Sequence, residues 1–293
     1  MKRVDGVLLL DKPPGVSSNT ALQRARRLLA AKSAGHTGTL DPMASGLLAL
    51  CFGEATKFAG ELLGAEKSYV ATLKLGERTA SGDAEGEVLE RRLVAVTREQ
   101  VVAVLERFRG EIQQIPPMYS ALKRDGRPLY EYARKGITLE REPRTVVVAS
   151  LELERFEGAQ AVISVRCSKG TYVRTLGEDI GEALGCGAHL CALRRTAIGE
   201  FRLEQAHRIE DLERLPEAER DQLLLAADVL VQDLPAVRLT EAMEALFLQG
   251  RTVGPLPAGA GRVRVYGVLG GFLGIGLADD LGAVRPKRLL STN

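Results

Sequence analysis

The chain has 293 residues, 45% hydrophobic and 27% charged, which is ordinary for a globular protein and excludes wholesale disorder. This length allows one large domain or two unequal ones. The apolar run at residues 7–10 is too short for a secretory signal, and no later run approaches the ~20 residues of a membrane span, so we expect a cytoplasmic protein without a membrane segment.

Charge is distributed unevenly along the chain, although the formal net charge is only +2. Residues 1–60 hold eight Lys and Arg against four Asp and Glu, and residues 123–144 hold seven against four. Residues 204–228 reverse the balance, with eight acidic residues against three basic ones. A positively charged face for nucleic acid is one interpretation of this pattern, and solvated helix surfaces are the other.

The first sixty residues predict a strand, a helix and a second strand. Residues 6–12 form a short apolar run that ends in a Pro-Pro-Gly turn. The next segment carries apolar residues on one helical face, with Ser18 or Asn19 as its cap and Gly35 at its end. Residues 46–53 are apolar again. The loop between helix and second strand, GHTGTLDPMASGLL at 35–48, is therefore expected at a sheet edge.

The middle of the chain predicts strands in runs, mixed with helices. Residues 67–76 alternate cleanly between two faces, and Thr97 with Gln100 forms a capping box for a helix at 98–110. A Pro-broken segment rich in Tyr, Lys and Arg follows. Strands at 144–158 and 159–170, a helix at 171–185 and a strand at 188–201 complete this part. Because few β-α-β alternations occur, the order predicts an α+β fold with a mostly antiparallel sheet.

The last third of the chain predicts a separate small module. An acidic stretch at 209–230 is interpreted as helical and divides the body from the tail. After a boundary near 232, residues 233–293 predict a short strand, a helix and then three or four short strands with glycine turns. About 60 residues suffice for a small β-module.

Familiar catalytic motifs are absent from the sequence. The histidines His36, His189 and His207 are scattered, and the four cysteines form no C-x-x-C pair, so we expect no metal site and reduced core cysteines. Phosphate-loop, dinucleotide and G-x-S-x-G patterns are missing. Asp41, before a proline and among glycines, taken alone is interpreted as a turn former. A reaction on RNA without a cofactor would need little beyond one such carboxylate and a basic surface.

Six blocks of sequence resemble the bacterial tRNA pseudouridine synthases of the TruB family. They are DKPPG, GHTGTLDPMASGLL, EKSYVATLKLG, IPPMYSALKRDGRPLYEYARKG, CSKGTYVRTLGEDIGEALGCGAHL and LRRTAIG, in the family's order between residues 5 and about 200. The resemblance implies an α+β pseudouridine-synthase core with a mixed, mainly antiparallel sheet at 1–232. It also implies an RNA-clamping thumb insert at about 115–145. The tail at 233–293 resembles a PUA-like RNA-binding module by its position and its glycine-rich strands.

The resemblance assigns three catalytic positions. Asp41 matches the catalytic aspartate, which can attack as a nucleophile or stabilise positive charge at C1′ of the ribose. Attack on the sugar, attack on the base and deprotonation at C2′ all remain open. Tyr69 matches a tyrosine that can stack on the uracil near C5, whose proton must leave. Arg174 matches the arginine that pairs with the aspartate and orients it.

The resemblance also implies residues that bind the substrate. His36 matches a residue used against the rearranged RNA loop, and Lys12, Tyr172 and Leu193 match further pocket positions. Asp83 matches an acidic position more loosely. In the thumb, phosphates would meet Lys123, Arg124, Arg127 and Arg134. The thumb tyrosines Tyr119, Tyr130 and Tyr132 either stack on bases or pack, and packing is the favoured interpretation.

The implied function is isomerisation of a T-loop uridine (tRNA position 55) to pseudouridine after base flipping, by a monomer without cofactor, metal or guide RNA. One alternative is a guide-RNA-dependent synthase acting on ribosomal RNA, against which the thumb-like insert and the lack of a long basic tail argue. The other is an RNA-binding or RNA-folding protein with a vestigial site, against which the intact set of Asp41, Tyr69 and Arg174 argues.

Overall fold

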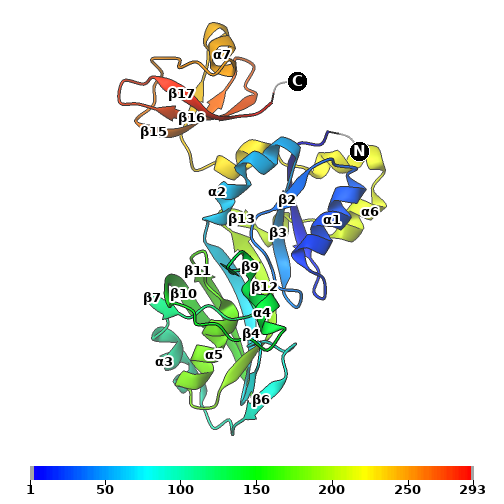
Figure 1. The fold of residues 1–293 in the computed structure, drawn as a ribbon, viewed down its shortest axis with the longest axis vertical. Helices are drawn as coiled ribbons and strands as arrows, with labels where there is room; N and C mark the ends of the chain where they lie inside the picture. Colours follow the sequence, from blue (N-terminus) through cyan, green and yellow to red (C-terminus); the bar gives the residue numbers. More distant parts are fainter. Residues whose placement is uncertain (1–2, 292–293) are drawn as a thin grey trace.

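The computed structural model describes residues 3–291, which form an elongated body with a small module at one end (Figure 1). The body is built on one mixed sheet, in the order β1-β3-β12-β4-β11-β10-β7. Its strands are β1 (Gly6–Lys12), β3 (Ser45–Phe52), β4 (Lys67–Leu75), β7 (Gly110–Gln114), β10 (Arg144–Glu157), β11 (Gln160–Cys167) and β12 (Ala188–Ile198). Two further strands, β2 (Ala34–His36) and β13 (Phe201–Arg202), pair with β3 and β12.

Strand β12 joins the two halves of the sheet. It runs parallel to β3 at Arg194 and Arg195, and antiparallel to β4 over its whole length. The neighbouring pairs β1–β3, β4–β11, β11–β10 and β10–β7 are antiparallel. The sheet is therefore mixed and mainly antiparallel, which confirms the predicted fold class.

Helices cover different halves of this sheet (Figure 1). In one half, α3 (Arg98–Glu106) and α5 (Val173–Ala183) pack on the strands around a core that includes Leu73, Val101, Ile163 and Leu176. In the other half, α1 (Ser18–Leu28) and α6 (Ile209–Arg214) cover β1 and β3, and α2 (Ala59–Leu63) lies toward the module. Within residues 3–291, no helix has the length and apolar character needed to cross a membrane.

The helix α1 starts and ends earlier than the sequence predicted. Its cap is Ser17, whose hydroxyl accepts the N–H of Thr20 at 3.0 Å, and neither Ser18 nor Asn19. Its last residue is Leu28, because Ala30 adopts a left-handed φ of 50°. The N–H groups of Ala30 and Ala31 then donate to the carbonyls of Arg27 and Arg26, which closes the helix. Gly35, predicted as the stop, lies in β2 instead. The capping box of Thr97 and Gln100 is confirmed.

The acidic stretch is less helical than predicted. Only α6 is an α-helix, and it stops at Arg214 because Leu215, which precedes Pro216, is extended with ψ of 142°. Two 3₁₀ segments follow at Glu217–Leu223 and Ala227–Val231. This segment packs against β1, where Leu225 and Val7 form an antiparallel bridge.

The C-terminal module has its own four-stranded sheet, in the order β14-β15-β16-β17. Its elements are β14 (Ala236–Arg238), α7 (Glu241–Leu248), β15 (Gly261–Tyr266), β16 (Phe272–Ala278) and β17 (Val284–Leu289). The rings of Phe272 and Phe58 lie 5.4 Å apart, and Arg262 forms an ion pair with Glu61 at 2.6 Å. The module therefore docks on the body through α2 and the turn before it. Its boundary near 232 stays a prediction.

Two small hairpins project from the body. One consists of β5 (Glu77–Thr79) and β6 (Val88–Arg91), joined by the loop at 80–87. The other lies in the insert at 115–145 and consists of β8 (Lys123–Arg124) and β9 (Arg127–Pro128), followed by the short helix α4 (Leu129–Ala133). In Figure 1 the insert crosses in front of the middle of the sheet.

Candidate active site

A cavity of about 640 Å³ lies where the sheet, the insert and the start of α5 meet. Seven segments contribute to its walls: the loop at 38–42, Leu63 at the end of α2, β4, the loop at 80–87, the insert, residues 168–174 and β12. Nine predicted residues line it: Asp41, Tyr69, Asp83, Tyr119, Tyr130, Arg134, Tyr172, Arg174 and Leu193. The structure thus brings together side chains that are up to 152 residues apart in sequence (Asp41 and Leu193).

Asp41 is held at the cavity by a turn with many fixed contacts. The hydroxyl of Ser18 donates to the carbonyl of Leu40 at 3.0 Å and accepts its N–H at 2.8 Å. The carbonyl of Asp41 accepts the N–H of Ala44 at 3.1 Å, and that of Pro42 accepts the N–H of Gly15. The turn chemistry read from the sequence is therefore present, and it leaves the Asp41 carboxylate 38% exposed.

Arg174 meets Asp41 from the first turn of α5. Its Nε lies 2.9 Å from Oδ2 of Asp41, while Nη1 donates to the carbonyl of Ser81 at 2.9 Å and Nη2 to that of Tyr119 at 2.7 Å. The Arg174 side chain is only 5% exposed and all three of its donor groups are anchored, whereas the Asp41 carboxylate stays open to the cavity. A guanidinium so fixed can orient one carboxylate oxygen.

Asp83 is a second acid beside this pair. Its Oδ2 lies 3.7 Å from Nε of Arg174, and its Oδ1 accepts the hydroxyl of Ser81 and the N–H of Glu85. The residue is buried, whereas Asp41 opens to the cavity. Asp83 therefore contacts Arg174 but does not present an exposed carboxylate to the cavity.

Tyr69 lies on β4 and faces the cavity opposite Arg195 of β12. Burial raises the pKa of the Tyr69 hydroxyl, and the positive charge of Arg195 partly counters that rise. Arg195 is 1% exposed, and its guanidinium donates to the carbonyls of Leu47 and Gly38 at 2.7 and 3.1 Å. Sequence reasoning missed Arg195. The signal was an arginine at an inward position of a strand, between Leu193 and Ala197.

Tyr172 and Leu193 form further parts of the wall. Tyr172 is the cap residue of α5, its N–H donates to Oε1 of Gln114 at 3.0 Å, and burial raises the pKa of its hydroxyl. Leu193 is buried on β12 and supplies apolar surface. Together with Tyr69, they make the cavity suitable for a planar aromatic group.

Four predicted binding residues lie outside the described lining of the cavity: Lys12, His36, Lys123 and Arg124. The buried amine of Lys12 donates to the carbonyls of Pro13 and Val16 at 2.9 and 2.7 Å, and burial lowers its pKa to about 8. His36 lies on β2, where burial lowers its pKa. Lys123 and Arg124 are exposed on β8. Lys12 thus braces the loop beneath Asp41, and the binding roles of all four stay predictions.

The insert reaches the cavity with other residues. Tyr119, Tyr130 and Arg134 line it, and the guanidinium of Arg134 lies 5.3 Å from the Tyr130 ring centre. The hydroxyl of Tyr132 donates to the carbonyl of Arg124 at 3.4 Å. Within the insert, Tyr130 thus packs against an Arg side chain and Tyr132 contacts the backbone. Whether any of them also stacks on a base stays a prediction.

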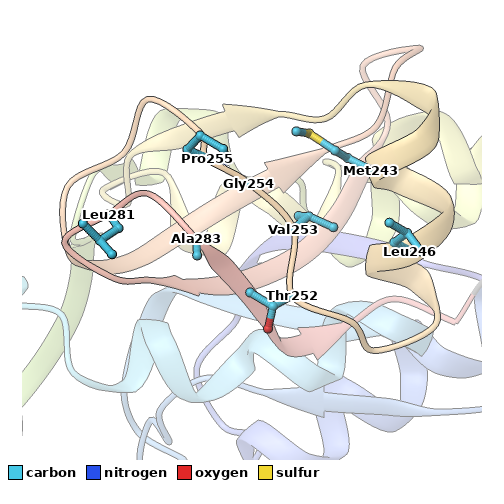
Figure 2. Close-up of a pocket in the computed structure, with 8 residues that line it drawn as sticks. All are labelled: Met243, Leu246, Thr252, Val253, Gly254, Pro255, Leu281 and Ala283. Carbon is cyan, nitrogen blue, oxygen red and sulfur yellow. The ribbon is translucent and has the colours of Figure 1, made fainter.

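Neither a metal cluster nor a second reactive cavity accompanies this site within residues 3–291. No group of three or more His, Cys, Asp or Glu side chains in this range is arranged to hold a metal ion. A second cavity lies in the C-terminal module (Figure 2), lined by Met243, Leu246, Thr252, Val253, Gly254, Pro255, Leu281 and Ala283. None of those side chains is titratable, so this second cavity offers no acid–base chemistry.

Comparisons with known proteins point to one family. Residues 26–173 match the family model described as TruB family pseudouridylate synthase (N terminal domain). Residues 174–232 match tRNA pseudouridylate synthase B C-terminal domain, and residues 235–290 match Pseudouridine synthase II TruB, C-terminal.

Curated relatives are similar over almost the whole chain. The tRNA pseudouridine synthase B of Azoarcus sp. (strain BH72) is 60% identical over 289 residues, covering 99% of this chain and 96% of the relative. The protein of the same name from Dechloromonas aromatica (strain RCB) is 56% identical over 290 residues, with the same coverage.

Solved structures agree in fold at lower identity. An H/ACA RNP bound to a substrate RNA containing 2′-deoxyuridine matches with a TM-score of 0.75 and 26% identity, covering 98% of this chain and 85% of that chain. A Cbf5-Nop10-Gar1 complex matches with a TM-score of 0.72 and 28% identity, covering 98% and 84%.

Proposed function

The chain belongs to the TruB family of pseudouridine synthases, and from this premise we propose that it isomerises one uridine in the T-loop of tRNA, with Asp41 as the catalytic carboxylate. It is an enzyme that forms pseudouridine in tRNA, as its close relatives are named. The proposal concerns the target site, the residues and the route to the base.

The observation that carries this proposal is the ion pair between Asp41 and Arg174 in the wall of the cavity. The reaction breaks the bond between uracil N1 and ribose C1′, turns the base and forms a bond from C5 to C1′. The C5 proton leaves and N1 gains one, so that the product is an isomer and no cofactor is required. A carboxylate held by a buried guanidinium can attack C1′ or C6, or take the C2′ proton, and all three remain open.

Tyr69 supports the last step of this scheme. Its ring lies in the same wall as Asp41, where it can stack on uracil, and its hydroxyl is the group that we assign to removal of the C5 proton. Leu193 and Tyr172 add apolar and aromatic surface around the same space. The cavity thus offers one carboxylate for the sugar side and one phenol for the base side.

The enclosed position of the site supports a route through base flipping. A stacked and paired uridine cannot place C1′ and C5 inside a cavity, so the nucleotide must leave the stack, at a few kcal/mol for unstacking. We propose that the insert at 115–145 holds the stem-loop meanwhile, because its exposed Lys123 and Arg124 can meet phosphates. That insert also argues against a guide-RNA-dependent mode of action.

The test is incubation of the purified enzyme with an unmodified tRNA transcript and no other protein or RNA, followed by mapping of pseudouridine at single-nucleotide resolution. We expect one product, in the T-loop, with and without a metal chelator. The Asp41→Asn variant is the control for contaminating synthases. Product at another position, or only with an added guide RNA, would contradict the proposal.

A further inference from the structure

Arg195 is a buried cation in the wall of the cavity. Its Nε donates to the carbonyl of Leu47 at 2.7 Å and its Nη2 to that of Gly38 at 3.1 Å. Both partners are neutral, whereas the neighbouring Arg194 lies 42% exposed and pairs with the carboxylate of Asp11 at 2.8 Å. Two adjacent arginines of one strand thus differ in environment: Arg194 is exposed and paired with a carboxylate, and Arg195 is buried and bonded to carbonyls.

Burying a charge opposes folding unless the charge is well compensated. Carbonyl dipoles compensate Arg195 only in part, so a structural role alone would be served as well by an apolar side chain on this strand. The register of the sheet shows what the guanidinium faces. Arg195 of β12 is the cross-strand partner of Tyr69 on β4, and both residues line the cavity.

The surroundings of the Tyr69 hydroxyl mostly favour its neutral form. Burial has the largest effect and raises its pKa, and Cys167 of β11 and Asp41 of the 38–42 loop act in the same direction. Arg195 acts against them through its charge and a side-chain hydrogen bond. A phenol can take a proton from carbon only after it has lost its own, so the basicity available at Tyr69 depends on Arg195.

We propose that Arg195 is a positioning residue for the reaction, which fixes the Tyr69 oxygen toward the cavity and stabilises it as the phenolate that accepts the C5 proton. The proton passes from C5 to the phenolate oxygen, and the electron pair of the C–H bond restores the aromaticity of the base. Arg195 is only 1% exposed at the cavity wall, so we assign it a role through Tyr69 and no direct contact with the substrate. The assignment rests on the proposed role of Tyr69.

The electrostatic part is tested without turnover. 3,5-Difluorotyrosine at position 69, whose ring fluorines bring the phenol pKa toward neutrality, allows a fluorine NMR titration of this one side chain. Arg195→Lys cannot reach the carbonyls of Leu47 and Gly38 and the Tyr69 oxygen together, and Arg195→Gln removes the charge. Each variant is expected to raise the titration midpoint by about one pH unit or more. Arg194→Lys is the matched control and should leave it unchanged. An unchanged midpoint in the Arg195 variants would overturn the proposal, and Arg195→Lys decides if Arg195→Gln does not fold.

The catalytic part is tested by a double-mutant cycle in single-turnover rates with tRNA. Each pH unit added to the Tyr69 pKa lowers the phenolate fraction about tenfold, so Arg195→Lys should slow the wild-type background about tenfold. In the Tyr69→Phe background it should have little further effect. Equal losses in both backgrounds would make Arg195 merely structural. Tyr69→Phe alone could turn over at the wild-type rate while the Arg195 variants still raise the titration midpoint of the fluorinated tyrosine. In that case the proposed role of Tyr69 would fail, and the contact between Tyr69 and Arg195 would stand.

Discussion

Two basic regions of this molecule differ in almost every physical respect. In the cavity wall, Arg174 and Arg195 are 4% and 1% exposed, and their donors are anchored on carbonyl or carboxylate oxygens. On the insert, Lys123 and Arg124 are exposed on a two-residue strand. A buried cation acts at short range on one oriented partner, and salt screens it little. An exposed cation acts on phosphates through counterion release, and salt weakens it steeply. The burial of a cation therefore determines whether it acts on one fixed partner or on RNA phosphates.

A hydrogen bond links the cavity wall to the insert. Nη2 of Arg174 donates to the backbone carbonyl of Tyr119, which belongs to the insert. The insert therefore supplies a ligand to the arginine that holds Asp41, besides offering charges to RNA. If the comparison holds, changes in the wall should alter the rate of chemistry, and changes in exposed insert charges should alter affinity.

Asp41→Asn should abolish product formation, because an amide is neither a nucleophile nor a base and carries no charge to stabilise C1′. The affinity for tRNA should stay similar, since the side chains are nearly the same size. Single-turnover assays and filter binding on the purified variant measure the two quantities. A thermal melt serves as the control, because Arg174 loses its closest carboxylate. Substantial residual product would remove Asp41 from the mechanism.

Tyr69→Phe should slow pseudouridine formation by ~10²–10⁴-fold, the usual effect of losing a positioned general base. The ring remains, so stacking and binding should stay near normal. In the wild type, burial raises the pKa of the Tyr69 hydroxyl, so the phenolate is scarce at neutral pH and the rate of this step should increase as the pH rises.

Two measurements check the Tyr69 prediction. The first is the pH dependence of the single-turnover rate, which should flatten in Tyr69→Phe. The second is rapid quenching, which should trap a rearranged nucleotide that still carries its C5 hydrogen. Near-wild-type turnover in Tyr69→Phe would assign the proton transfer to another residue or to water.

Arg174→Lys should lower the single-turnover rate about 10²-fold, because a misplacement of about 1 Å at the reacting group can have that effect. One ammonium group cannot reproduce the contacts of Arg174 with Asp41, Ser81 and Tyr119 together. The dissociation constant for tRNA should change little. An unaltered rate would show that the orientation of Asp41 does not depend on the guanidinium fork.

Reversing the insert charges, with Lys123→Glu and Arg124→Glu together, should have the smallest effect. We expect weaker tRNA binding and a shallower log–log dependence of affinity on salt, by roughly one unit for each phosphate that the insert no longer neutralises. Arg214→Glu is the matched control, since its side chain is 80% exposed on α6, in the acidic part of the chain. An unchanged slope would make the insert a packing element.

The sequence predicted best where local rules decide. The alternation in β4 and the capping box before α3 depend on neighbouring residues, and both are confirmed. The end of α1 could not be read from the sequence, because a left-handed Ala30 closes the helix where a glycine was expected. The acidic stretch failed for a related reason, since the extended residue before Pro216 outweighs helix-forming composition.

For the site, local chemistry was not sufficient. Asp41 alone suggested only a turn, and its pairing with Arg174 came from the family resemblance, because 133 residues separate them. The sequence did not indicate Arg195, because the burial of a residue on β12 depends on how β3 and β4 pack beside that strand. A sequence shows which residues alternate, but only the fold shows which alternating positions face a cavity.

The most direct test of the division between the two regions is a single-turnover titration of enzyme against a fixed trace of tRNA, at low and high salt. It should compare Arg174→Lys with the doubly reversed insert variant. The titration separates the plateau rate from the dissociation constant. We predict that Arg174→Lys lowers the plateau about 10²-fold at both salt concentrations with the dissociation constant preserved. The insert variant should keep the wild-type plateau and lose affinity, mainly at low salt. A lowered plateau in the insert variant, or a loss confined to affinity in Arg174→Lys, would contradict the account.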